Sequence, residues 1–186
     1  RAFADEHGVK QVYDDLDEMS RTVDLGIVCT ANWDLHLAQS LPFIAEGKPV
    51  LVDKPLAGSW SDLDTMRLWE EQGYVVGGGS SLRYSSEIFE VRDRLAHQGN
   101  EILSVYAGCS GFDYYYAVHL VSMLQGLLGP GITSARQLGT DPWRVELAWV
   151  SGQTAIIEVA PPDHSVPFGM SIMTDNGWEQ RVITDI

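Results

Sequence analysis

The residues best placed to do chemistry are Asp53, Lys54 and Pro55, which directly follow the short apolar run Pro49–Val52. Open α/β sheets bind their ligands just beyond the carboxyl ends of parallel strands, and a strand over this run would end at Asp53. A lysine in that position can contact a substrate hydroxyl and take part in proton transfer. The alternative is a solvent-exposed lysine that precedes a turn-forming proline.

A second polar segment, Thr30–His36, follows another apolar run and opens the next predicted helix. Backbone N–H groups at such a helix start, the Thr30 hydroxyl and the Asn32 amide can together hold a polar ligand. The same groups can instead cap the helix, and His36 can equally be a structural hydrogen-bonding residue.

A third group of candidates lies on the helix predicted over Tyr114–Leu128. One face of this helix carries residues at positions i, i+4, i+7 and i+11, namely Tyr115, His119, Ser122 and Gly126. The other faces are apolar, so we expect the helix to be buried. A buried imidazole needs hydrogen-bonding partners, and in a cleft it can transfer protons. The alternative for His119 is a core histidine whose hydrogen bonds are satisfied internally.

Strands and helices that alternate in the first half of the chain must position the first two groups. In chain order, the predicted elements are Val23–Thr30, Asp34–Glu46, Pro49–Val52, a helix capped by Ser59 or Ser61 that ends near Gly73, and Tyr74–Val76. This order predicts a parallel sheet with right-handed crossovers. The nearly continuous apolar first strand predicts burial on both faces, with Cys29 as a buried free thiol. Gly77-Gly78-Gly79 is either a ligand loop or the segment by which the chain passes between domains.

Beyond Tyr84 the pattern changes. Helices are predicted after a cap at Ser85 or Ser86 and over Tyr114–Leu128, with a strand at Ile102–Ala107 between them. Period-two alternation predicts antiparallel strands, most clearly at Trp143, Val145, Leu147 and Trp149. Asn176-Gly177 predicts a tight hairpin turn. The predicted fold class is therefore α/β plus α+β, with a boundary near Tyr84.

Composition limits the partners of this chain of 186 residues. Its 26 acidic and 12 basic residues give a formal net charge of −14, which argues against binding nucleic acid or anionic membranes. No apolar run approaches the roughly 18 residues of a membrane span. Cys29 and Cys109 form neither a disulfide framework nor a metal-ligand spacing, so we expect a cytoplasmic protein without a metal site.

Together these segments resemble the Gfo/Idh/MocA family of oxidoreductases, which includes glucose–fructose oxidoreductase and inositol dehydrogenase. The motifs whose order and spacing carry the resemblance are Ala2-Phe3-Ala4, Val23–Thr30, His36, Glu46–Val50, Asp53–Leu56 and Arg83-Tyr84. The resemblance implies a Rossmann domain that binds NAD or NADP, followed by an α+β domain with an open antiparallel sheet. We therefore expect a partial NAD(P)-binding Rossmann domain over residues 1–84 and a substrate and oligomerisation domain over residues 85–186.

The same resemblance implies roles for individual residues. Lys54 would lie beside the nicotinamide and the reacting hydroxyl, and His119 would move the hydroxyl proton. The implied catalytic set also includes Tyr115 and Tyr116. The residues implied to contact the cofactor are Thr30, Asn32, His36, Asp53, Pro55 and Arg83. The implied reaction is hydride transfer between nicotinamide and a hydroxyl or carbonyl of a sugar or polyol.

The chain departs from the family pattern in three respects. The family's first strand and glycine-rich loop would precede Arg1, so we expect an N-terminally incomplete Rossmann domain. Tyr115 stands where many members carry aspartate, and the short Tyr116–His119 segment is similar to a compact subgroup. The family's closing segment would follow Ile186.

Three functions are compatible with these features. The first is an NAD(P)-dependent oxidoreductase. The second is a non-catalytic, sugar-binding or dimer-forming relative that has lost dinucleotide binding. The third uses NAD transiently for elimination or glycoside cleavage and needs the same Lys54 and His119. Trp143 and Trp149, with the alternating Phe168, Met170 and Ile172, can form a homo-oligomer face on the open sheet or pack in the core.

Overall fold

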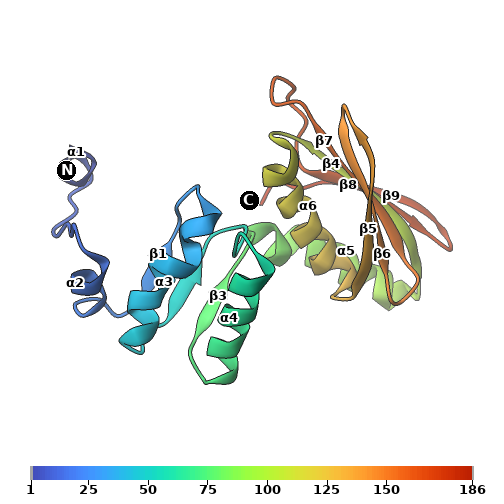
Figure 1. Ribbon diagram of the computed structural model, residues 1–186. Coiled ribbons are helices and arrows are strands. Elements are labelled where there is room, and N and C mark those ends of the chain that lie inside the picture. The colour runs from blue at the N-terminus through green and yellow to red at the C-terminus, as the bar shows by residue number, and fades with distance from the viewer. Residues whose placement is uncertain (1, 186) are drawn as a thin grey trace. The chain divides into compact units, whose positions relative to one another are not determined.

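A computed structural model describes residues 2–185 of the chain. They form two compact units, one that ends at Gly79 and one that begins at Ser80 (Figure 1). The division thus lies five residues before Tyr84. Residues 80–84 group with the second unit because the 3-10 helix η2 (Ser81–Tyr84) packs against helix α6 (Asp113–Leu128).

The first unit contains a three-stranded parallel sheet in the order β1-β2-β3. The strands are in register, with Val28 opposite Val52 and Val52 opposite Gly78. The elements of this unit are α1 (Ala2–Glu6), α2 (Leu16–Ser20), β1 (Gly26–Val28), η1 (Trp33–Leu35), α3 (His36–Ala45), β2 (Val50–Val52), α4 (Trp60–Glu71) and β3 (Val76–Gly78). The predicted Rossmann-type parallel sheet is confirmed.

Burial on both faces of the first sheet was expected, and this expectation is wrong for the described residues. Helices α3 and α4 pack on one face, where Val28, Val50 and Val52 are buried. On the opposite face, the side chain of Ile27 is 62% exposed and that of Leu51 is 46% exposed. Among residues 2–185, the core of this unit therefore lies on one side of the strands. Its members are Val28, Phe43, Ile44, Val50, Val52, Met66 and Trp69.

The two cysteines also differ from expectation. Cys29 follows the last residue of β1 and is exposed, so the predicted buried thiol at this position is wrong. Cys109 is the buried cysteine, and burial raises the pKa of its thiol to about 12. Its thiol therefore stays protonated and unreactive at neutral pH.

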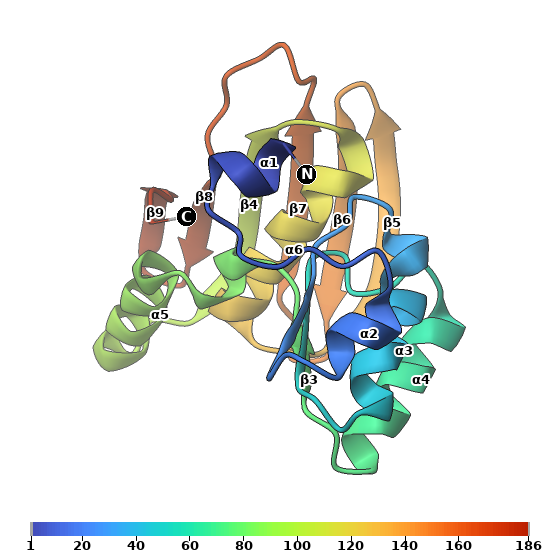
Figure 2. The ribbon, with the colours of Figure 1, turned by 90° about the vertical axis from the view of Figure 1, so that its left-hand side faces the viewer.

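The second unit contains a six-stranded sheet in the order β5-β6-β7-β4-β8-β9 (Figure 2). Its neighbouring strands are antiparallel except for the central pair β4 and β7, which is parallel. The elements of this unit are η2, α5 (Ser86–Gln98), β4 (Ile102–Ser110), α6, β5 (Ile132–Thr140), β6 (Trp143–Trp149), β7 (Thr154–Ala160), β8 (Gly169–Thr174) and β9 (Gly177–Val182). The expected open sheet is present, and its single parallel pair makes it mixed.

Helix α6 covers the inner face of this sheet. It lies over β4 and β7, as Figure 2 shows, and buries Leu120, Met123 and Leu124 in the core. Period-two alternation directs every second strand residue to this core, so Val145, Leu147 and Trp149 of β6 are buried. Trp149 also donates from its indole to the carbonyl of Gly129. Trp149, Met170 and Ile172 are thus core residues and cannot form an oligomer face.

The hairpin between β8 and β9 turns one residue earlier than predicted. Thr174 pairs with Gly177, so the two-residue turn is Asp175-Asn176 rather than Asn176-Gly177. The Thr174 hydroxyl stabilises the turn, since it accepts from the amide of Asn176 and donates to the carbonyl of Gly177.

Two acidic residues 98 positions apart fasten the end of the described chain to the start of α5. Asp185 accepts hydrogen bonds from the Ser85 hydroxyl (2.6 Å) and from the amide and hydroxyl of Ser86 (2.6 and 2.7 Å). Glu87 in turn accepts from the amide and hydroxyl of Thr184. The hydrogen bonds from Ser85 and Ser86 hold the pKa of Asp185 well below its usual range.

The three consecutive glycines after α4 have different structural requirements. Gly78 has a φ of +149°, and a Cβ there would lie 1.9 Å from the carbonyl oxygen of Val52. A Cβ at Gly77 would meet nothing nearer than a Leu51 methyl at 3.9 Å. Only Gly78 therefore lets β3 approach β2 as closely as observed.

We predict that Gly78→Ala destabilises the first unit by about 2–3 kcal/mol, because the new methyl group displaces backbone in β2. The matched variant Gly77→Ala should change the free energy of unfolding by less than about 1 kcal/mol. Urea unfolding followed by tryptophan fluorescence measures both. Equal losses in the two variants would contradict this account of Gly78.

A second prediction concerns Asp185. Because its folded pKa is depressed, its contacts are fully present above the ordinary aspartate pKa of about 3.9 and are lost as pH falls through the lower folded value. We expect Asp185→Asn to speed amide hydrogen exchange of Ser86 and Glu87 several-fold at neutral pH. The exposed Asp141→Asn is the control and should leave both amides unchanged. Unchanged exchange in Asp185→Asn would show that the start of α5 does not depend on its hydrogen bonds to Asp185.

Candidate functional site

The parallel register brings the first two groups of candidate residues to one edge of the first sheet. Thr30 lies two residues beyond β1, and Asp53 and Lys54 directly follow β2. The amide of Asp53 donates to the carbonyl of Val28, and that of Gly79 donates to Val52, so pairing continues past the strand ends. This is the edge at which open α/β sheets place their ligands.

His36 joins the two loops at this edge. Its ring is fully buried, with Nδ1 3.0 Å from the carbonyl oxygen of Pro55 and Nε2 2.8 Å from that of Thr30. A neutral imidazole can donate to one of these carbonyls and an imidazolium to both. Both ring nitrogens thus face backbone carbonyls, so His36 ties the two loops together.

Lys54 lies between Asp53 and Pro55 in the second of these loops. The residue is only 9% exposed, so most of its side chain is shielded from solvent. Asp53 is half-buried, and Pro55 is buried and fixed through its carbonyl by His36. The local structure therefore restrains the backbone on both sides of Lys54.

The remaining candidates of this edge are exposed. Thr30 donates from its hydroxyl to the side-chain carbonyl of Gln39 at 2.8 Å. Asn32 caps η1, because its Oδ1 accepts from the amide of Asp34 at 3.1 Å. For Asn32, the capping alternative described above is therefore what the structure shows, and the Thr30 hydroxyl is held beside it.

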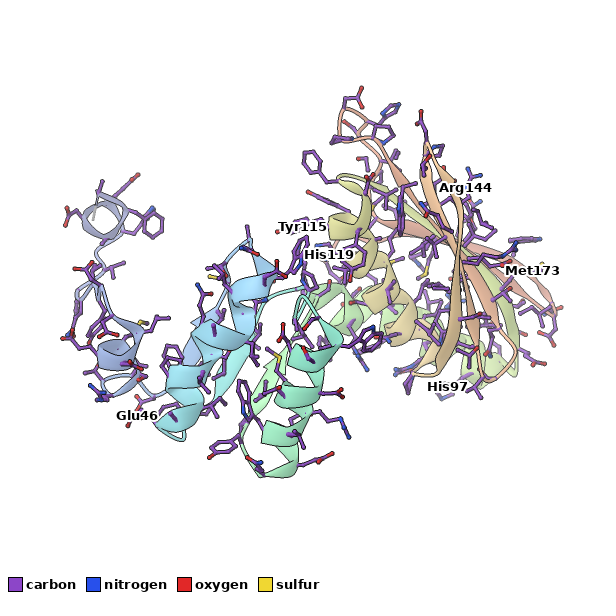
Figure 3. The ribbon with its side chains drawn as sticks, viewed as in Figure 1. Glu46, His97, Tyr115, His119, Arg144 and Met173 are labelled. Carbon is purple, nitrogen blue, oxygen red and sulfur yellow. The ribbon has the colours of Figure 1, made fainter. Side chains whose placement is uncertain are left out.

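The second unit positions His119 on α6. Its Nδ1 lies 2.7 Å from the hydroxyl of Ser80, which is 3% exposed. The imidazole also meets the rings of Tyr116 and Phe168 edge-on, at centroid distances of 5.9 and 5.6 Å. Figure 3 shows Tyr115 and His119 on the same side of α6, as their spacing predicts.

Further along the same helix face, α6 touches η2. A Cβ at Gly126 would lie 2.6 Å from the carbonyl oxygen of Arg83, so glycine permits this contact. The Arg83 guanidinium donates to the side chain of Gln125 at 3.2 Å and borders a cavity of about 410 Å³ that also includes Phe89 and Arg92. Arg83 therefore lies about two helical turns from His119.

The structure thus places the predicted site residues in two groups. The group in the first unit consists of Thr30, His36, Asp53, Lys54 and Pro55. The group in the second unit lies on α6 and η2 and consists of Tyr115, Tyr116, His119 and Arg83. Ser80 and Phe168, which contact His119, were not predicted from the sequence as site residues. Ser80 stands 39 residues from its partner His119, and no local spacing relates them. Over residues 2–185, no helix is long and apolar enough to cross a membrane, and no cluster of three metal-ligating side chains occurs.

Comparison with known proteins gives a family match and two curated relatives. Residues 1–79 match the family model described as "Oxidoreductase family, NAD-binding Rossmann fold". The chain is 25% identical over 199 residues to a putative UDP-kanosamine synthase oxidoreductase subunit of Amycolatopsis mediterranei, covering 90% of this chain and 54% of that protein. It is 33% identical over 128 residues to 1,5-anhydro-D-fructose reductase of Ensifer adhaerens, covering 67% of this chain and 36% of that protein. The chain therefore spans about half the length, or less, of these relatives.

Solved structures extend the similarity to both units. Myo-inositol dehydrogenase from Lactobacillus casei, in complex with NAD(H) and myo-inositol, matches 100% of this chain and 63% of its own, with a TM-score of 0.82 and 18% identity. GenD2 from gentamicin A biosynthesis, in complex with NAD, matches 97% of this chain and 61% of its own, with a TM-score of 0.77 and 20% identity. At these identities the likeness establishes the fold. The family model over the first unit and the fold shared by both units support an assignment to the Gfo/Idh/MocA family of oxidoreductases.

Proposed function

We propose that the protein catalyses NAD(P)-dependent hydride transfer to or from a hydroxyl or carbonyl carbon of a sugar or polyol. The observation that carries this proposal is the position of Lys54, a shielded cation at the ligand-binding edge of a parallel sheet. Two relatives support the substrate class, since one is named a 1,5-anhydro-D-fructose reductase and another was crystallised with myo-inositol.

The chemistry of this edge fits a dinucleotide. The Asn32 amide nitrogen and the Lys54 ammonium supply hydrogen-bond donors, the Thr30 hydroxyl oxygen supplies an acceptor, and the backbone at Asp53 and Pro55 borders them. When bound, the nicotinamide would accept or donate the hydride. We assign Thr30, Asn32, Asp53 and Pro55 to the cofactor, with His36 positioning their loops. Arg83 is assigned to the boundary between cofactor and substrate.

Proton transfer is assigned to the second unit. In the oxidative direction the substrate hydroxyl loses its proton to His119 as its carbon loses a hydride, and the reverse steps reduce a carbonyl. Lys54 donates a hydrogen bond to the reacting oxygen and stabilises negative charge on it. Tyr115, on the same side of α6 as His119, is assigned to a substrate hydroxyl. Tyr116 stacks on Phe168 with ring planes 10° apart and holds the imidazole in place.

We also propose that the outer face of the six-stranded sheet binds a second copy of the chain. Figure 3 shows Arg144 and Met173 on the side of the sheet opposite α6. On this face Trp178 is 69% exposed, and a groove of about 420 Å³ lies where Gly108 pairs with Gly169. Tyr106 and Glu158 form part of its wall, and burial together with the hydrogen bond to Glu158 raises the pKa of Tyr106. An exposed tryptophan and a groove on the same face are typical of a protein interface.

We expect the purified protein to bind NADH or NADPH and Lys54→Ala to lower kcat at least about 100-fold, because the reacting oxygen loses its charged donor. His119→Ala should have an effect of similar size. Lys10→Ala, which removes an exposed lysine of the same unit, should leave kcat unchanged. Nucleotide fluorescence and steady-state kinetics measure these effects, with circular dichroism to confirm the fold. Absence of nucleotide binding would contradict the proposal and favour the non-catalytic alternative.

The oligomer proposal predicts a dimer or larger assembly in sedimentation velocity. Trp178→Glu should shift the protein towards monomer, because a carboxylate is costly to bury at an interface. Trp60→Glu changes an exposed tryptophan of the first unit and should leave the assembly unchanged. A wild-type protein that is monomeric at micromolar concentration would overturn this proposal.

A further inference from the structure

The contact between Ser80 and His119 has the geometry of a hydrogen bond that fixes the orientation of a catalytic imidazole. The serine Oγ lies 2.7 Å from Nδ1 of the imidazole, which is short for a hydrogen bond between nitrogen and oxygen. Ser80 is almost fully buried, so water does not compete for this bond. Nδ1 is thereby directed at the hydroxyl, and Nε2 is the nitrogen that can exchange a proton with a substrate.

The same oxygen caps η2. The amide of Leu82 donates to Oγ of Ser80 at 3.2 Å, which fixes the serine rotamer from the side of the turn. A hydroxyl oxygen has two acceptor sites, and the N–H groups of Leu82 and of Nδ1 can occupy one each. In that arrangement the cap and the imidazole share one fixed acceptor.

We propose that Ser80 is a positioning residue that accepts a hydrogen bond from Nδ1–H of His119 and so keeps Nε2 of the neutral ring as the proton acceptor. This inference rests on the proposed function, in which His119 takes the proton of the substrate hydroxyl. The bond from Nδ1–H persists when the ring becomes an imidazolium, because only Nε2 gains and loses a proton. The serine therefore supports both directions of the reaction without a charge of its own.

Two aromatic rings complete the restraint on His119. Tyr116 and Phe168 stack on each other at 6.3 Å and both meet the imidazole edge-on. Edge-to-face contacts favour one plane for the imidazole but do not select which nitrogen faces the turn. Ser80 selects the nitrogen, because its hydroxyl is a hydrogen-bond acceptor for Nδ1–H, whereas the rings of Phe168 and Tyr116 contact the imidazole only through ring faces and edges.

The test combines the tautomer of His119 with kinetics. Long-range proton–nitrogen NMR of the ¹⁵N-labelled protein, at a pH where the ring is neutral, should show a protonated Nδ1 in the wild type. In Ser80→Ala that preference should be lost, and kcat should fall about 10- to 100-fold while KM changes less than about twofold. Ser80→Thr keeps the hydroxyl and should restore both. Ser81→Ala, an exposed serine of the same turn, is the matched control and should resemble the wild type.

Three outcomes would overturn the inference. They are a wild-type His119 protonated on Nε2 when neutral, a Ser80→Ala variant with unchanged tautomer and kcat, and an equal effect in Ser81→Ala. Because Ser80→Ala also removes the cap of η2, rescue by Ser80→Thr separates the hydrogen bond from packing. A protein without nucleotide binding would contradict the proposed function alone, since the tautomer in wild type and Ser80→Ala still decides the role of Ser80.

Discussion

Close approach of backbone segments, which only glycine allows, sets the geometry of both groups of candidate residues. At Gly78 a Cβ would lie 1.9 Å from the carbonyl oxygen of Val52, so β3 can pair with β2 only without a side chain there. At Gly126 the carbonyl of Arg83 takes the place that a Cβ would fill. The first contact defines the sheet edge from which Lys54 emerges. The second seats η2 on α6, which places Ser80 against His119.

Hydrogen-bonding side chains then fix the loops that glycine has brought close. In the first unit the buried ring of His36 reaches the carbonyls of Thr30 and Pro55, so the loops after β1 and β2 are tied to the same helix start. In the second unit the Ser80 hydroxyl serves η2 and α6 together. Both devices restrain the residues proposed to meet the ligand without themselves being exposed to it. Such support is what a binding site needs to hold its geometry.

The sequence allowed the fold class and most elements to be predicted, because hydrophobic periodicity and capping residues act locally. Ser59 and Ser85 begin α4 and α5 as predicted, and the alternation in β6 identifies its buried face. Features that depend on contacts between distant segments were not predicted. These include the exposed face at Ile27, the parallel pairing of β4 with β7, and the contact of Ser80 with a histidine 39 residues away. The residues suggested for ligand contact stay predictions, and the supporting role of His36 became visible only with its two carbonyl partners.

The alternation of the six-stranded sheet separates two tasks of the second unit. Ile157 and Val159 of β7 face the core beneath α6, while Glu158 between them faces the outer groove. The same strands therefore carry the helix of His119 on one face and the proposed oligomer surface on the other. A second copy bound to the outer face would leave α6 uncovered, and it would restrain the strands on which the helix rests. Since Leu120, Met123 and Leu124 of α6 pack into the core that the sheet forms, the position of His119 depends on the rigidity of that sheet.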